Sequence, residues 1–322
     1  MKRNRTQLLT VLSLLITCLL AACTAAPTST PQPTTSTEEP TQQIEGHPII
    51  LGDISDDPAN IFDEMQPLAD YLAARLADEG VTEGQVKVVS SPEEMIAALE
   101  NGEIDLYFDS VYPATVIGDA SKAQPILRRW KDGVEKYHTV IYTTKESDIT
   151  SVEDLQGHMI AFDEPTSTSG YVLPFVYLVE QGLKPVEKST PEDKVAPDEV
   201  GYVFSSDDDN SLEWLNGGLV SAAATDNITY KKDIPAEMAP NLVVLAETES
   251  LPRQIAIARP GLDPDLQAAI IEVLKGADET PEGQAALEAF DDTARFDEFP
   301  EGIDQAIKRM RELLEIVRKQ QQ

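Results

Sequence analysis

From residue 47 onward, the chain alternates between short apolar runs and segments in which apolar residues recur at helical spacing. The short runs predict strands, at residues 48–54, 85–90 and 104–108. The helical spacing predicts helices between these strands, at residues 61–76 and 91–99. A strand–helix alternation of this kind predicts a parallel sheet with right-handed crossovers, in which ligands bind beyond the carboxyl ends of the strands.

The remainder of the chain repeats the pattern. It predicts further strands, at residues 124–130, 137–144, 158–162, 200–204, 220–225, 242–246 and 253–259. It predicts closing helices, at residues 263–276, 281–290 and 302–319, and loops, at residues 109–113 and 184–199. We therefore expect two α/β units, with the strand at 137–144 crossing towards the second unit and the end of the chain returning to the first. Two such units facing each other across a hinge form a cleft lined by loops of both.

The turn after the strand at 158–162 carries the clearest candidate for binding chemistry. Its residues Ser167, Thr168 and Ser169 supply hydroxyl groups just before a helix that is predicted at 171–182. The first turn of a helix has unpaired backbone N–H groups and a positive dipole, and Gly170 has no Cβ where a ligand would need close approach. Such an end can hold a phosphate-like or carboxylate group. The simpler alternative is a helix N-cap with spare hydroxyl groups.

The N-terminal 22 residues have the pattern of a secretory signal, with a basic start and an apolar core at residues 8–20 that is too short for a comfortable membrane span. The core ends in Leu20-Ala21-Ala22-Cys23, which resembles the lipobox of bacterial lipoproteins, cleaved before the cysteine and lipidated on it. The alternative is an ordinary signal peptide with an incidental Cys23. Residues 24–46 are rich in Thr, Pro, Ser and Gln, which indicates a disordered tether.

The charge of the chain limits the classes of partner that it can bind. The chain has 57 acidic and 25 basic residues and a formal net charge of −32. Removing the signal segment would also remove Lys2, Arg3 and Arg5, so the mature chain would carry an even larger negative charge. The net charge would therefore repel nucleic acid and anionic lipid surfaces, and we expect no nucleic-acid partner. Because salt screens charges beyond roughly 8–10 Å, an anion can still bind in a pocket, provided that the pocket supplies its own donors.

Several chemistries have no basis in the sequence. The three histidines, His47, His138 and His158, are isolated and lack metal-ligand spacing. The acidic run Asp207–Asp209 lacks the glycine and distal glutamate of a calcium loop. There is no phosphate-binding P-loop, no dinucleotide-binding glycine motif and no nucleophile elbow. We therefore expect neither an enzyme nor a cofactor or metal site.

Four segments in order resemble the substrate-binding lipoproteins of ABC importers, specifically the phosphate, phosphite and phosphonate-binding group. They are Pro67 to Leu72, Met95 to Leu106, Ser110 to Ala114 and Ser167 to Pro174, and the resemblance covers about residues 48–275. It implies a type II periplasmic-binding-protein fold, an α/β architecture of two lobes with a hinge and an interlobe cleft that closes around the ligand. Lobe 1 would comprise residues 47–143 and 248–322, and lobe 2 residues 144–247.

The resemblance also implies the ligand-binding residues. Ser167, Thr168, Ser169 and Gly170 match the helix start that holds the ligand's anionic oxygens, and Ser110 and Tyr112 match the lobe 1 segment that lines the cleft. Asp226 matches an acidic position of lobe 2 that can meet a ligand amine. Two simpler alternatives remain open, because Tyr112 is equally compatible with a half-buried turn aromatic and Asp226 with a helix cap.

One departure from the family pattern concerns the loop after the strand at 200–204. Phosphonate and phosphite binders often have a histidine there, whereas this chain has the acidic run 205–209. Carboxylates repel a phosphate dianion unless they are protonated. The departure leaves open a zwitterionic ligand or one without phosphorus, and the run is also typical of a solvated helix start.

These patterns together predict an extracytoplasmic solute-binding lipoprotein, anchored to the membrane through lipidated Cys23. It would act as a monomer that captures a small anion or zwitterion and delivers it to an ABC permease. An alternative is a receptor that presents its closed form to a membrane signalling protein. An extracellular enzyme on the same scaffold would need a titratable pair in the cleft, and the sequence does not identify one.

Overall fold

The computed structural model describes residues 46–320. The predicted signal segment, Cys23 and almost all of the predicted tether lie outside the described residues.

The first of two mixed sheets has the strand order β14-β4-β13-β3-β1-β2. Its strands are β1 (His47–Ile54), β2 (Val81–Val89), β3 (Leu106–Asp109), β4 (Gln124–Arg129), β13 (Gln254–Ala258) and β14 (Phe296–Asp297). As predicted, β1 pairs in parallel with both β2 and β3. The returning strand β13 inserts antiparallel between β3 and β4, so residues from both ends of the chain share this sheet.

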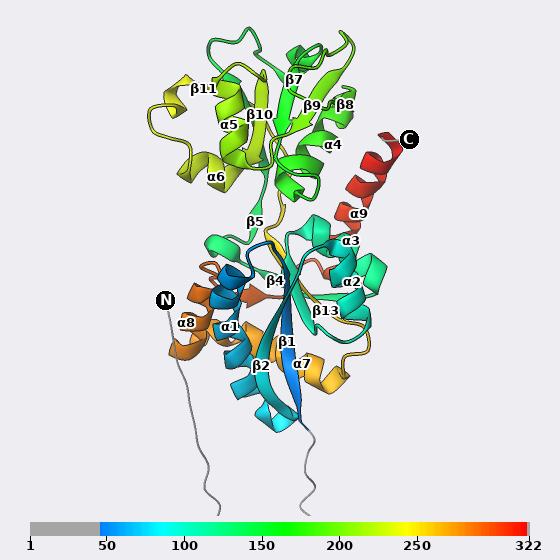
Figure 1. The fold of residues 1–322 in the computed structure, drawn as a ribbon, viewed down its shortest axis with the longest axis vertical. Helices are drawn as coiled ribbons and strands as arrows, with labels where there is room; N and C mark the ends of the chain where they lie inside the picture. Colours follow the sequence, from blue (N-terminus) through cyan, green and yellow to red (C-terminus); the bar gives the residue numbers. More distant parts are fainter. Residues whose placement is uncertain (1–45, 321–322) are drawn as a thin grey trace, which may run out of the picture. The chain divides into compact units, whose positions relative to one another are not determined.

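Helices cover both faces of the first sheet (Figure 1). They are α1 (Pro58–Arg75), α2 (Pro92–Glu100), α3 (Val111–Ser121), α7 (Pro264–Lys275) and α8 (Pro281–Ala289). The apolar stripes of α1, α7 and α8 pack on one face, and α2 and α3 pack on the other. We define lobe 1 as this sheet with these helices.

The second sheet has the strand order β11-β6-β10-β7-β9-β8. Its strands are β6 (Thr139–Thr144), β7 (Met159–Phe162), β8 (Pro185–Glu187), β9 (Val200–Phe204), β10 (Ala222–Asp226) and β11 (Leu242–Glu247). Four of these, β7 to β10, run parallel to one another. The helix α4 (Leu173–Glu180) packs on one face, and α5 (Asp208–Asn216) and α6 (Asn227–Lys232) pack on the other. We define lobe 2 as this sheet with α4 to α6.

Two short strands connect the sheets. β5 (Lys136–Tyr137) pairs antiparallel with β12 (Leu251–Pro252), so the outgoing and returning segments run side by side. We expected lobe 1 to extend to residue 143, but residues 139–144 form β6 and pair with β10 and β11. The apolar stretch at 137–144 therefore contributes to two different sheets, and the crossing lies before Thr139. Periodicity along one strand carries no information about its partners, so the sequence did not reveal this division.

Two other expectations were wrong. The loop predicted at 109–113 ends early, because α3 begins at Val111 and accommodates Pro113 in its first turn, where a proline costs no helical hydrogen bond. The loop predicted at 184–199 contains the edge strand β8. The first correction matters for the site, because it places Tyr112 on a helix and not in a loop.

The last helix, α9 (Ile303–Gln320, red in Figure 1), packs against α3 of lobe 1 and α4 of lobe 2. Its apolar stripe is buried at Ile307, Met310, Leu314 and Val317, whereas Ile303 is 39% exposed. Through these residues, one continuous apolar core joins α3 to α4. Within residues 46–320, no helix is both long enough and apolar enough to span a membrane.

Candidate functional site

The hydroxyl-rich turn forms the start of a helix, as predicted. Residues Thr168–Val172 form a single π-helical turn that leads directly into α4. Ser167 is the N-cap, and its Oγ accepts a hydrogen bond of 2.9 Å from the Gly170 N–H. A Cβ on residue 170 would lie 2.3 Å from the Cβ of Asp163. Glycine is therefore needed here because Asp163 packs against it, which is a different reason from the ligand approach that we expected.

This turn meets lobe 1 directly. The Thr168 hydroxyl donates to Ser110 Oγ at 2.9 Å and accepts from the Tyr112 N–H at 3.0 Å. Thr168 is only 1% exposed, and Ser169 is also buried. The Ser169 carbonyl accepts from the Thr139 hydroxyl at 2.6 Å, which ties the turn to β6. The structure thus brings together residues of the predicted site that are more than fifty positions apart in sequence.

The Tyr112 side chain lines a cavity, whereas its backbone N–H contacts Thr168. The cavity has a volume of about 410 Å³ and lies between the lobes and α9. The other lining residues are Val116, Pro165, Tyr171, Glu187, Phe204, Leu314, Val317 and Arg318. The Tyr112 ring is half-buried, as in the simpler alternative that we considered.

Asp226 acts as a helix cap. It is the N-cap of α6, and its Oδ1 accepts from the N–H groups of Ile228 at 2.8 Å and Thr229 at 3.1 Å. Its Oδ2 accepts from the Thr229 hydroxyl at 3.1 Å. The capping alternative therefore describes its contacts within the described chain, and a contact with a ligand amine stays a prediction. The acidic run behaves similarly, because Asp207 caps α5 by accepting from the Asn210 N–H at 2.7 Å.

Partly buried carboxyl groups occupy the carboxyl ends of the strands in both lobes; sequence reasoning named Asp208 only as part of the acidic run and did not single out Asp53 or Asp109. In lobe 2, burial raises the pKa of Asp208 to about 7, with the Thr225 hydroxyl opposing and Asp163 and Asp226 adding. In lobe 1, burial raises the pKa of Asp53 to about 7, and the neighbouring Asp109 adds to the effect. The sequence did indicate their position, since most of these acids end or closely follow a predicted strand. Near neutral pH, both edges therefore carry groups that can exchange a proton.

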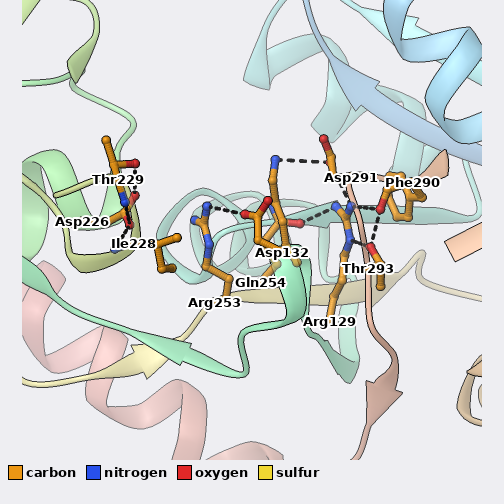
Figure 2. Close-up of polar contacts among 11 residues, drawn as sticks. Arg129, Asp132, Asp226, Ile228, Thr229, Arg253, Gln254, Phe290, Asp291 and Thr293 are labelled. Carbon is orange, nitrogen blue, oxygen red and sulfur yellow. Dashed lines mark hydrogen bonds and ion pairs between the residues drawn. The ribbon is translucent and has the colours of Figure 1, made fainter. Parts of the chain in front are cut away.

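Two arginines stand near the crossing between the lobes, the buried Arg129 and the partly buried Arg253, and sequence reasoning missed both (Figure 2). Arg129, at the end of β4, is fully engaged within lobe 1. It donates to Gln254 Oε1 at 2.5 Å, Phe290 O at 2.7 Å, Thr293 Oγ1 at 2.8 Å and Asp291 Oδ2 at 2.8 Å. Arg253 follows β12 and has fewer contacts, which are described below. Within residues 46–320, no group of three or more His, Cys, Asp or Glu side chains is arranged to hold a metal ion.

The fold and this meeting of donors define a class. Two α/β lobes, joined by paired crossing strands and touching through polar groups at the carboxyl ends of their strands, are the architecture of a hinged substrate-binding protein. Residues 54–301 match the family described as "ABC transporter, phosphonate, periplasmic substrate-binding protein". The chain belongs to this family, as its resemblance in sequence predicted.

Individual relatives are distant. The phosphate-import protein PhnD of Mycolicibacterium smegmatis is 24% identical over 178 residues, which are 54% of this chain and 54% of the relative. The alignment thus spans about half the length of that relative.

Among solved structures, XAC2383 from Xanthomonas citri, bound to a chloride ion, has a TM-score of 0.79 and 26% identity. The match covers 84% of this chain and 98% of XAC2383. PhnD1 from Prochlorococcus marinus, in complex with methylphosphonate, has a TM-score of 0.62 at 15% identity, over 84% of this chain and 98% of PhnD1. At that identity, the second likeness shows the fold alone.

Family membership confirms three predictions: the resemblance itself, the two-lobed periplasmic-binding-protein fold, and the absence of enzymatic activity, because the family binds solutes for ABC transporters. It also implies an extracytoplasmic location.

Proposed function

We propose that the protein is an extracytoplasmic lipoprotein that captures a small anion or zwitterion between its lobes and delivers it to an ABC permease. The ligand is phosphonate-like, a class that includes phosphate and phosphite. The observation that supports this proposal most directly is that donors of both lobes meet at Thr168, Ser110 and Tyr112. A ligand that accepts from both lobes bridges them, and its binding therefore favours the closed form.

The chemistry of the turn fits an oxyanion. The Tyr112 N–H and the hydroxyl groups of Ser110 and Thr168 now bond with one another, and each can instead donate to an anionic oxygen. Ser167 and Ser169 flank them at the positive end of the helix. A micromolar dissociation constant corresponds to about −8 kcal/mol, which a few charge-assisted hydrogen bonds can supply. In a zwitterionic ligand, Asp226 is the predicted partner of the ammonium group.

The relatives support phosphorus oxyanions as the ligand class. The Mycolicibacterium smegmatis relative is named a phosphate-import protein, and the family description names phosphonate. The test is isothermal titration calorimetry of the wild-type protein with phosphate, phosphite, methylphosphonate and 2-aminoethylphosphonate. At least one should bind in the micromolar range or tighter, and a folded sample that gives no heat with any of them would exclude phosphorus ligands.

A hydroxyl deletion tests the location of the site. Thr168→Val keeps the shape of the side chain but removes its hydroxyl group, so it should weaken binding about tenfold or more through the loss of roughly 1–3 kcal/mol. Thr166→Val is the matched control, because the Thr166 side chain is exposed and makes only a 3.5 Å contact with Glu164. Equal affinity of the two variants would move the site away from the turn.

The anchor is a further part of the proposal. Lipidation of Cys23 would hold the monomeric globule at the membrane through the tether at residues 24–46, within reach of the permease. Labelled palmitate should therefore be incorporated into the wild-type protein and not into Cys23→Ser. Equal labelling of both proteins would contradict a lipid on Cys23.

A further inference from the structure

Arg253 occupies the crossing between the lobes. It lies between β12 and β13, where the chain returns from lobe 2 to lobe 1. Its backbone N–H donates to the Glu135 carbonyl at 2.9 Å, in line with the pairing of β5 and β12. The side chain therefore projects from a paired segment of the backbone.

The Arg253 side chain is partly buried and makes few hydrogen bonds. Its side chain is 16% exposed, and its Cζ lies 4.6 Å from the ring centroid of the buried Tyr137, which is the geometry of a cation–π contact. Its NH2 group donates to Asp132 Oδ2 at 3.4 Å, which is long for a charge-assisted hydrogen bond. Its Nε is buried and has no hydrogen-bond partner among the described residues.

The Arg253 side chain has fewer hydrogen-bond partners than that of the nearby Arg129. Both arginines stand near the same crossing, Arg129 fully buried and Arg253 partly so, but the Arg129 side chain has four hydrogen-bond partners whereas that of Arg253 has one, within the described chain. Arginine presents five donors in a rigid fork, and leaving buried donors unsatisfied is costly. A partly buried arginine whose buried Nε has no partner among the described residues, and which lies at a hinge, is therefore arranged for a group that the chain itself does not supply.

The neighbours of Arg253 belong to the proposed site. Burial raises the pKa of the Tyr137 phenol, while Arg253 and the hydroxyl groups of Thr168 and Ser169 lower it. Tyr137 is thus affected by both Arg253 and the hydroxyl-rich turn. Burial opposes the charge of Arg253, but Tyr137, Asp226 and Asp132 outweigh it and raise its pKa. In Figure 2, Arg253 stands between Asp226 of lobe 2 and Asp132 of lobe 1.

We propose that Arg253 binds the anionic group of the ligand from the hinge side, through its Nε and an adjacent N–H, while the turn at residues 167–170 binds it from lobe 2. The ligand class is an oxyanion with at least two oxygens on one centre, as in a phosphonate, a phosphate or a carboxylate. This inference rests on the proposed function, since it assigns the positive charge of the same site. It also explains how a chain of net charge −32 holds an anion, because one guanidinium supplies the local charge.

The test compares Arg253→Gln and Arg253→Lys with the wild type by calorimetry, with phosphate, phosphite and methylphosphonate as probes. Arg253→Gln should bind each probe that the wild type binds at least about tenfold more weakly, and Arg253→Lys should be intermediate because it keeps the charge without the fork. Arg295→Gln is the matched control and should bind like the wild type. Arg295 also stacks on an aromatic ring, that of Trp130 at 4.7 Å, but its side chain is 46% exposed and pairs with Asp297 at 3.7 Å.

A second variant separates ligand binding from a structural role. Asp132→Asn removes the carboxylate that now competes for Arg253, and asparagine tolerates the positive φ of 55° at this position. We expect it to bind the probes a few-fold more tightly than the wild type does. A purely structural ion pair would instead give lower stability in thermal unfolding and no gain in affinity. This variant decides the question if Arg253→Gln does not fold.

The outcomes distinguish the two proposals. Equal affinity of the wild type and Arg253→Gln, or an Asp132→Asn variant without a gain in affinity, would overturn the role of Arg253 and leave the proposed function intact. A wild-type protein that binds neither these three probes nor 2-aminoethylphosphonate would exclude phosphorus ligands, on which the test of both proposals depends.

Discussion

At the scale of single residues, the role of each group in the candidate site depends on its neighbouring residues. Gly170 is required because Asp163 packs where a Cβ would be. Thr168, one of three hydroxyl residues in the turn, is the one that bonds to Ser110 and Tyr112 of lobe 1. Ser167 is engaged as the N-cap. Similar side chains in one short turn therefore serve packing, capping and contact between lobes.

The partly buried acid Asp208 predicts a pH dependence of stability. Burial raises its pKa to about 7 in the folded protein, against about 3.9 in an unfolded chain. Between these values, the unfolded state has lost the proton that the folded state still holds, so this group makes the protein less stable as the pH rises from 4 to 7. Asp208→Asn removes the titration. Its free energy of unfolding, relative to the wild type, should therefore increase by about 1–3 kcal/mol from pH 4 to pH 8.

Urea denaturation of both proteins across this pH range measures the effect. Asp209→Asn is the matched control for removing one charge from the same helix turn, since Asp209 is its exposed neighbour. A relative stability of Asp208→Asn that does not change with pH would contradict the assignment.

At the scale of elements, α9 connects the lobes. Arg309 forms a bidentate pair with Glu249, beside the returning strand, and also donates to Glu180 at the end of α4 at 3.2 Å. Two residues further along, Arg311 pairs with Asp119 of α3. The helix therefore has polar contacts to both lobes, in addition to its apolar stripe. Any opening of the hinge must rearrange one of these two sets of contacts.

The Arg309 network predicts a salt-sensitive contribution to stability. Arg309→Gln should lower the free energy of unfolding by about 1 kcal/mol and speed hydrogen exchange in α9, because a networked ion pair is lost. The loss should shrink in 1 M salt, where screening weakens the pair in the wild type. Lys308→Gln is the control, since Lys308 pairs only with Glu312 of the same helix, at 3.7 Å, among the described residues. Equal effects of both variants would argue against a connecting role of α9.

At the scale of the whole molecule, the net negative charge opposes the binding of an anionic ligand. The net charge of −32 favours solubility and disfavours anions, yet the family to which the chain belongs takes phosphonates. Partly buried acids with raised pKa values at both sheet edges reduce part of that negative charge, and Arg253 adds a positive group where the lobes meet. The proposed ligand site would thus differ in charge from the surface around it.

Much of the fold could be predicted from the sequence because it is local. Strand and helix periodicity and the caps at Ser91, Ser167 and Asp207 depend on residues within about one helical turn of each other, and the structure contains them. The family could also be recognised from four short segments in order, since a shared ancestor preserves such segments. Even the hydroxyl turn and its neighbours Ser110 and Tyr112 were identified in this way.

Only the tertiary structure decided which of these residues meet. Thr168 and Ser110 are 58 positions apart, and Arg253 reaches Tyr137 only because β5 and β12 pair. The division of residues 137–144 between two sheets and the partly buried acids at the strand ends have the same origin. Contacts of this kind depend on how the sheets order their strands, which no local pattern specifies. The sequence thus determined the elements and the family, and the packing of the lobes determined the chemistry where they touch.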